Sequence, residues 1–203
     1  MLIDFRQLFP KYGINPKGVL HVGANVGEEA PVYLELGIKR QVWIEANPEI
    51  YQKLKVNISA NPEAEALNYC ISDRYEKVKF HVSNNGSQSS SILELGTHLI
   101  AHPEVNYIKE IEMDAIPLND LSIDKSLDFL NIDLQGAELK ALRGMGNLLH
   151  QFKWGYLEVN KEELYKGCAL VGEIDSYLSG FGFRRVETKW AGNTGWGDAL
   201  YIK

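Results

Sequence analysis

The 203-residue sequence has few cysteines, little positive charge and no long apolar run. Its two cysteines, Cys70 and Cys168, are too few for a disulfide framework and do not form a C-x-x-C motif. We therefore expect reduced thiols that pack as small apolar side chains in a cytoplasmic protein. A chain of this length buries enough surface to fold without a disulfide or a structural metal.

Positive charge is scarce because 21 Lys+Arg are outnumbered by 27 Asp+Glu, which gives a net charge of −6. Nucleic acid and anionic membranes are bound non-specifically through a basic face, so the sequence predicts neither as a partner. No stretch approaches the roughly 18 apolar residues of a membrane span. Residues 1–13 include Asp4 and no long apolar run, so we expect no signal peptide.

The chain divides into a short leader and one domain. Residues 1–17 are predicted to form an amphipathic leader helix that ends at Pro10, and residues 18–203 form the domain. Strands are expected over 19–22, 42–44, 66–71, 77–82, 108–116, 127–133, 156–159, 183–189 and 199–202, and helices over 28–36, 48–59, 136–149 and 171–178. This alternation predicts a three-layer α/β fold with right-handed crossovers and a C-terminal antiparallel hairpin.

The first strand is followed by a turn of small residues, V-G-A-N-V-G. Open α/β sheets usually hold a cofactor at this turn; Gly23 allows a sharp bend, and Gly27 lets a ligand approach the helix. Glu45 ends the next strand, where a carboxylate can accept hydrogen bonds from both ribose hydroxyls of an adenosine. Together these features indicate a cofactor that contains a nucleoside.

The same turn is a poor dinucleotide motif. The pattern G-x-G-x-x-G requires glycine at position 25, where the chain has Asn25, and Glu28 and Glu29 would repel a pyrophosphate. S-adenosylmethionine (SAM) fits better, because it carries a sulfonium cation and an amino-acid tail but no phosphate. An NAD(P)-dependent oxidoreductase remains the weaker alternative.

Five longer motifs carry a family resemblance. They are HVGANVGEEA, WIEANPE, YCISD, SQSSSI and FLNIDLQGAELKALRGM, in this order. From Gly18 to Lys203 the chain resembles the FkbM-type family of SAM-dependent methyltransferases. The resemblance implies a doubly wound, class I (Rossmann-like) methyltransferase sheet of seven strands with the last antiparallel.

The resemblance also implies SAM as the cofactor and locates its contacts at the ends of the strands. Ser72 and Asp73 would lie near the adenine, and the turn after the first strand near the amino-acid tail. The cofactor-binding residues predicted in this way are Gly23, Ala24, Asn25, Gly27, Glu45, Ala46, Ser72, Asp73 and Asp133.

Methyl transfer to a hydroxyl needs a base for the hydroxyl proton, and three carboxylates are candidates. Asp133 ends the most apolar strand and is our first choice, with a helix N-cap as the alternative. Glu138 lies one helical turn further on, where it could merely complement the helix dipole. Glu158 ends the following strand. The three together could hold a divalent cation, but Gln135 stands where a further carboxylate is frequent, so we predict no metal.

Polar and aromatic residues are the candidates for binding the acceptor. In the resembled family a serine run such as the one with Ser89 and Ser90 lies beside the active site; a flexible loop is the alternative. Trp190 and Trp196 border a glycine-rich loop that suits a carbohydrate ring, unless the hairpin packs one of them into the core. Asn160 follows Glu158.

The sequence thus predicts SAM-dependent O-methylation of a hydroxyl on a sugar, a glycan or another small-molecule acceptor. The chain could also form a homo-oligomer. The main alternative is a non-catalytic member that binds cofactor or glycan. Asn119, Asn131 and Gln135 support that alternative, because each replaces a charged residue frequent in the family.

Overall fold

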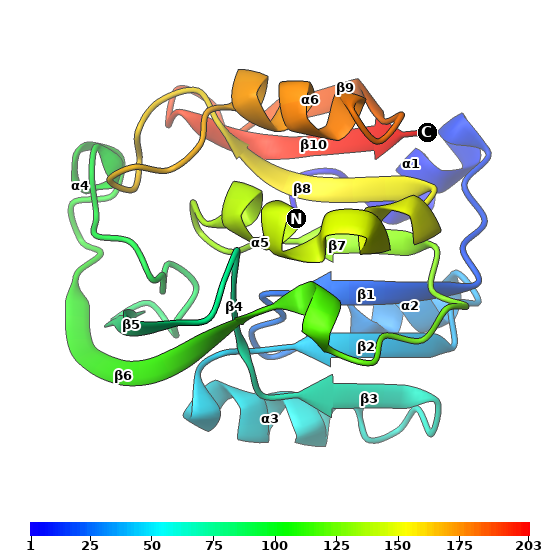
Figure 1. Ribbon diagram of the computed structural model, residues 1–203, viewed down its shortest axis with the longest axis horizontal. Helices are drawn as coiled ribbons and strands as arrows, with labels where there is room; N and C mark the ends of the chain where they lie inside the picture. Colours follow the sequence, from blue (N-terminus) through cyan, green and yellow to red (C-terminus); the bar gives the residue numbers. More distant parts are fainter.

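The computed structural model describes residues 1–203 and has a seven-stranded sheet at its centre (Figure 1). The strand order is β3-β2-β1-β7-β8-β10-β9. The strands are β1 (Gly18–Val22), β2 (Arg40–Ile44), β3 (Ala64–Leu67), β7 (Phe129–Ile132), β8 (Trp154–Asn160), β9 (Arg184–Trp190) and β10 (Trp196–Ile202). Only β10 runs against the others, because it pairs antiparallel with both β8 and β9. The prediction of seven strands with the last antiparallel is confirmed.

Helices cover both faces of this sheet. They are α1 (Phe5–Tyr12), α2 (Ala30–Glu35), α3 (Pro48–Ile58), α5 (Glu138–Met145) and α6 (Val171–Ser179), with a short α4 (His98–Ala101) outside the layers. Leu142 of α5 and Leu178 of α6 belong to one apolar core, and Tyr33 of α2 and Leu54 of α3 belong to the other. Figure 1 shows α5 and α6 in front of the sheet and α2 behind it.

Strand β1 explains why the sheet lies between two cores. All five of its residues are buried. Leu20 and Val22 point into one core, whereas Val19 points into the other and His21 stacks on Trp43 at 4.8 Å between ring centres. A parallel strand that is covered on both faces reads as a continuous apolar run, which is how the sequence predicted it.

The N-terminal segment is part of this core. Phe5 stacks against Tyr33 and meets Phe129 edge-on, so α1 closes the core over β7. The prediction that Pro10 ends this helix is wrong. Pro10 lies inside α1, and the helix ends at Gly13, which adopts a left-handed conformation with φ 63°.

A second sheet of three strands stands beside the main one. It contains β4 (Cys70–Ser72), β5 (Glu76–Ser83) and β6 (Tyr107–Pro117) in the order β4-β6-β5. The single strand predicted over 66–71 is therefore divided between two sheets. Asn68 marks the break, because its side-chain amide donates to the carbonyls of Glu45 and Ala46. The small sheet and α4 lie at the end of the main sheet where β1 and β2 stop (Figure 1).

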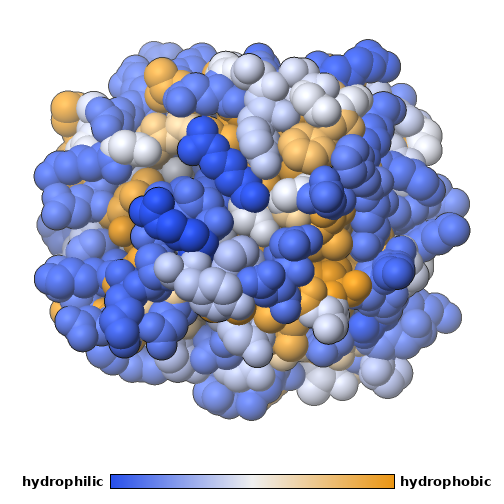
Figure 2. Space-filling model, in the orientation of Figure 1, coloured by the Kyte–Doolittle hydropathy of each residue, from blue (hydrophilic) through white to orange (hydrophobic).

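Two further helical elements complete the chain. They are the 3-10 turns η1 (Leu118–Asp120) and η2 (Gly146–Gln151), and the second of them replaces the last part of the helix predicted over 136–149. None of the helices is long and apolar enough to span a membrane. The face drawn in Figure 2 is mostly hydrophilic, with apolar side chains visible in separate patches.

Candidate active site

A cavity of about 810 Å³ lies at the carboxyl ends of β1, β2, β7 and β8. Its outer wall comes from the segment 84–105, which connects β5 to β6 and includes α4, and from the hairpin residue Trp196. Ligand pockets generally measure about 300–1,000 Å³, and open α/β sheets bind ligands at this end of their strands. The position and size of the cavity therefore suit a cofactor together with an acceptor.

The turn after β1 comes into close contact with the end of β7. Gly23 has φ +83°, and a Cβ atom there would lie 1.7 Å from the carbonyl oxygen of Asp133. The amide of Asp133 also donates to the carbonyl of Val22 at 3.0 Å. Glycine is thus required at position 23, and this contact fixes where the Asp133 side chain enters the cavity.

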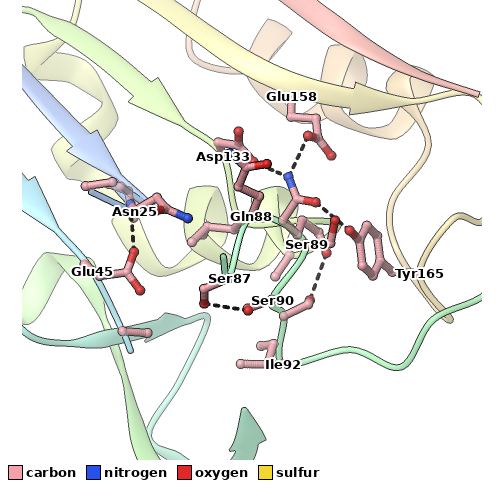
Figure 3. A pocket seen from close by; sticks show the side chains of 18 of the residues that line it. Asn25, Glu45, Ser87, Gln88, Ser89, Ser90, Ile92, Asp133, Glu158 and Tyr165 are labelled. Atoms are coloured by element: carbon pink, nitrogen blue, oxygen red, sulfur yellow. Dashed lines mark hydrogen bonds between the residues drawn. The ribbon is translucent and has the colours of Figure 1, made fainter. Parts of the chain in front are cut away.

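Glu45 connects the same turn to β2. Its carboxylate accepts the backbone N–H of Asn25 and that of Asn47, both at 2.8 Å, and it lines the cavity (Figure 3). Burial raises the pKa of Glu45 to about 7. Each oxygen accepts one amide and keeps a further lone pair, so the carboxylate can still accept hydroxyl donors from a ligand.

Ser72 and Asp73, the two predicted adenine contacts, lie outside the cavity lining. Ser72 donates to Glu76 at 2.6 Å, Asp73 faces Lys140 at 3.6 Å, and neither side chain lines the cavity. The carbonyl of Ser72 packs so closely under α5 that a Cβ on Gly144 would lie 2.1 Å from it. The cavity is lined instead by the residues just before them in β4 and its approach, Tyr69, Cys70 and Ile71.

The remaining predicted cofactor contacts lie at the cavity, with one exception. Gly23, Ala24, Asn25, Glu45, Ala46 and Asp133 line it. Gly27 does not, because it packs against α3, where a Cβ would lie 2.8 Å from a methyl carbon of Leu54. The role of Gly27 is to let α3 approach the turn.

The three predicted catalytic carboxylates lie together. Asp133, Glu138 and Glu158 each have an oxygen within 4.8 Å of the others. The side-chain amide of Gln135 donates to Asp133 at 2.6 Å and to Glu158 at 2.8 Å, the two bonds drawn between these carboxylates in Figure 3. Tyr165 donates in turn to the side-chain oxygen of Gln135. The side-chain amide of Gln135 thus joins Asp133 and Glu158.

Glu138 belongs to this cluster but lies behind the cavity wall. The cavity does not reach it, and one of its oxygens accepts the amides of Leu134 and Gly136 at 2.9 and 3.0 Å. These bonds close the turn between β7 and α5, while the other oxygen has no partner. Glu138 therefore shapes the turn that presents Asp133 and does not face an acceptor.

Burial changes the proton affinity of the cluster. Loss of water raises the pKa of Asp133 to about 6 and that of Glu138 to about 7. Burial and the neighbouring charges of Asp133 and Glu138 raise the pKa of Glu158 well above its ordinary value. At neutral pH, Asp133 is therefore mostly ionised and more basic than an ordinary aspartate, and the raised pKa of Glu158 favours its protonated form.

The predicted acceptor residues divide into two groups. Ser89, Ser90 and Trp196 line the cavity. Trp190 and Asn160 do not: a lysine ammonium lies 4.0 Å above the Trp190 ring, and the Asn160 side chain is fully buried without a hydrogen-bond partner. The hairpin turns only one of the two tryptophans toward the cavity, because strand residues alternate between faces.

His98 was not among the site residues predicted from the sequence. The structure buries this side chain and places it in the cavity wall, 5.3 Å from Tyr165 and 4.9 Å from His102 between ring centres. Its Nδ1 has no partner, and burial lowers its pKa, which keeps the ring neutral. The spacing of His98 and His102 on one helical face was the available signal.

Asp198 was missed as well. It lines the cavity because β10 pairs with β8 in a register that sets Asp198 opposite Glu158. Its carboxylate accepts the hydroxyl of Tyr156 at 2.7 Å and the amide of Leu2. The antiparallel register that brings it here could not be read from local sequence.

Residues 21–185 match the Methyltransferase FkbM domain. The chain belongs to the FkbM methyltransferase family. It is 28% identical over 173 residues to the 2-O-methyltransferase NoeI of Sinorhizobium fredii (strain NBRC 101917 / NGR234), which covers 80% of this chain and 71% of NoeI. It is thus a SAM-dependent methyltransferase, and the resemblance noted in the sequence is confirmed.

Solved structures confirm the fold. A SAM-dependent methyltransferase from Aquifex aeolicus superposes with a TM-score of 0.54 at 18% identity, covering 99% of this chain and 90% of that one. Magnesium protoporphyrin IX methyltransferase (ChlM) from Synechocystis PCC 6803 with bound SAM gives 0.55 at 10% identity, covering 97% and 75%. Both agree with the class I sheet.

The raised pKa values of the buried carboxylates predict how the stability of the protein depends on pH. A carboxylate whose pKa is raised by folding stabilises the protein below its ordinary pKa, and this contribution is lost as the pH rises through the raised value. Because the pKa values of Glu45 and Glu138 are raised to about 7 and that of Glu158 is also raised, we expect a lower melting temperature at about pH 8.5 than at about pH 6.5. Thermal unfolding across this range checks the sign.

Glu158→Gln should reduce this pH dependence and stabilise the protein at the alkaline end, because it removes one buried charge. Glu63→Gln is the matched control, since Glu63 is exposed and lies outside the cavity. Equal pH profiles for wild type and Glu158→Gln would contradict the prediction.

Proposed function

We propose that the protein transfers the methyl group of SAM to a hydroxyl oxygen of a sugar, a glycan or another small-molecule acceptor. The observation that carries this proposal is the position of Asp133. Its basic carboxylate lies on the cavity between the turn held by Glu45 and a wall of hydroxyl and aromatic side chains. SAM, when bound, supplies an electrophilic methyl group on its sulfonium.

The residues at the strand ends fit SAM. Glu45 would accept the ribose hydroxyls, and Tyr69, Cys70 and Ile71 offer an apolar wall for the adenine. The turn at Gly23 leaves the backbone open to the amino-acid tail. Carboxylates rather than cations surround this end of the cavity, as a positively charged cofactor requires.

Asp133 would accept the acceptor's hydroxyl proton as the new oxygen–carbon bond forms and the carbon–sulfur bond breaks with its electron pair on sulfur. Gln135 holds this carboxylate in place through its bond at 2.6 Å, and Tyr165 fixes the orientation of Gln135. The raised pKa of Glu158 favours its protonated form, which makes it the weaker candidate for the base. Positioning of the two reactants supplies the rest of the rate.

Oxygen is favoured as the methylated atom for two reasons. The acceptor wall carries Ser89, Ser90 and Tyr165, whose hydroxyls pair with those of a carbohydrate, and Trp196 offers an aromatic face for a sugar ring. The 2-O-methyltransferase NoeI, the relative described above, is named for methylation of an oxygen.

The non-catalytic alternative loses most of its support. Asn131 is buried and donates to the hydroxyl of Tyr33 at 2.8 Å, and Asn119 is exposed in η1; neither lines the cavity. Of the three uncharged residues that stand where the family often has a charged one, only Gln135 contacts the candidate base. Its hydrogen bond holds the Asp133 carboxylate in position.

A methyl-transfer assay tests the proposal. Purified protein is incubated with isotopically labelled SAM and a panel of hexosides and 6-deoxyhexosides, and the products are analysed by mass spectrometry. We expect label on a hydroxyl oxygen of at least one sugar. Label on nitrogen or carbon, or no transfer to any hydroxyl compound by protein that binds SAM, would contradict O-methylation.

A further inference from the structure

The charged acidic and basic side chains that line the cavity are all carboxylates, although the N-terminal ammonium of Met1 adds one positive charge near Asp133. On the cofactor side, Glu28, Glu29 and Glu45 line it, and no lysine or arginine lines any part of it. Glu28 and Glu29 stand just before α2, where doubly wound folds commonly bind phosphate at the helix N-terminus. Their carboxylates make this seat unfavourable for an anion.

The charged side chains on the acceptor side of the cavity are also acidic. Asp133 and Asp198 line its inner end beside Glu158, whose raised pKa favours the uncharged form, and Glu104 lines its outer end. Two buried histidines of the wall, His98 and His21, add no positive charge at neutral pH. Burial lowers the pKa of His98, and it lowers that of His21 to about 3.

Cations near the cavity are engaged elsewhere. Lys166 pairs with Glu94 at 2.6 Å, and Lys109 pairs with Glu49 at 2.7 Å. Lys161 lies over the ring of Trp190, which faces away from the cavity. Proteins bind a diphosphate through Arg, Lys, a metal ion or a free helix N-terminus, and the cavity is lined by no arginine or lysine.

The rest of the acceptor wall is uncharged. Ser89 accepts the side-chain amide of Asn85 at 3.0 Å, and Ser87 and Ser90 share a hydrogen bond of 2.6 Å (Figure 3). Together with the Trp196 ring, these groups can bind hydroxyls and a sugar face but cannot neutralise a phosphate.

We infer, building on the proposed function, that the acceptor is an uncharged glycoside and that nucleoside diphosphate sugars are excluded. The sugar must then have left its nucleotide carrier before it is methylated. A glycosyl transfer is the class of reaction that supplies this substrate, and methylation follows it.

The test measures binding of the two sugar forms to protein saturated with S-adenosylhomocysteine (SAH). Methyl glycosides of common hexoses and 6-deoxyhexoses are compared with the UDP or GDP forms of the same sugars by ligand-observed NMR and calorimetry. We expect at least one glycoside to bind, and its nucleotide form to bind at least about 100-fold more weakly. Equal or tighter binding of the nucleotide form overturns the inference, and so does the absence of binding by any carbohydrate.

The methyl-transfer assay keeps this result separate from the proposed function. Methylation of a nucleoside diphosphate sugar would overturn the inference and leave O-methylation intact. Binding of a glycoside without transfer to any oxygen would leave the inference standing and contradict the proposed function.

A charge reversal at the cavity mouth tests the physical cause. Glu104 is exposed and lines the cavity, so Glu104→Lys adds a cation there with little effect on the fold. We expect affinity for UDP and GDP sugars to rise about tenfold, with SAM affinity unchanged. Glu63→Lys makes the same change in net charge at an exposed position outside the cavity. An equal rise in the control, or none in Glu104→Lys, would contradict an effect of the cavity's own charge.

Discussion

Asp133→Asn is expected to lower kcat for methyl transfer by about 10²- to 10⁴-fold while SAM affinity stays within a few-fold of wild type. The asparagine oxygen can still accept the Gln135 amide, so the geometry is kept, but the side chain can no longer take a proton. Single-turnover rates and calorimetric titration of SAM separate the two effects.

Glu138→Gln is the matched control for this variant. Its side-chain oxygen can still accept the amides of Leu134 and Gly136, and the residue does not line the cavity. We expect it to retain most of the wild-type turnover. Equal losses in both variants, or an active Asp133→Asn, would show that Asp133 is not the base.

The pH profile provides an independent readout of the same role. Because the pKa of Asp133 is raised to about 6 and the ionised form is the base, kcat/KM should rise as the pH increases through about 6 and then level off. Asp133→Asn should lose this acid limb. A rate that falls with increasing pH across this region would contradict the assignment.

Gly23→Ala is expected to reduce the free energy of unfolding by at least about 3 kcal/mol and to abolish turnover in whatever protein still folds. A left-handed backbone costs a non-glycine residue about 1–3 kcal/mol, and overpacking costs about 1–3 kcal/mol more. Here the new Cβ would lie 1.7 Å from the carbonyl oxygen of Asp133, so β1 and β7 must separate and the base must move. Chemical denaturation measures the loss.

Gly37→Ala isolates the backbone contribution. Gly37 has φ +80°, close to the value at Gly23, but nothing lies within 4 Å of its would-be Cβ. We therefore expect a loss of only about 1 kcal/mol and normal turnover. Similar losses in the two variants would mean that the contact with Asp133 contributes nothing.

The main sheet could be predicted because its strands are buried on both faces and stand out as apolar runs between helices. The small sheet could not be recognised from the same signal. Residues 66–71 read as one strand, and they are divided between two sheets by the bonds that Asn68 makes to Glu45 and Ala46, 22 or 23 positions away. Such a break depends on tertiary contacts and leaves little mark on local sequence.

The candidate site likewise contains residues that could be predicted from the sequence and residues that could not. Glu45, Asp133 and Glu158 were predicted because the carboxyl ends of parallel strands meet at one edge. Glu138 and Asn160 were predicted by the same reasoning, but neither lines the cavity, because the turn that follows a strand sets the direction of the side chains beyond it. His98 was missed because long-range backbone bonds bury it, among them the one from its amide to the carbonyl of Leu164 at 3.2 Å.

The most direct test of the account is a calorimetric titration of the purified protein with SAM and SAH, with NAD and NADP as controls. We predict micromolar binding of SAM and SAH at one site, none of the dinucleotides, and a large loss of affinity in folded Glu45→Gln, which keeps an oxygen for one of the two amides but loses the charge. Binding of NAD in preference to SAM, or SAM binding that Glu45→Gln leaves unchanged, would contradict the account of the cavity.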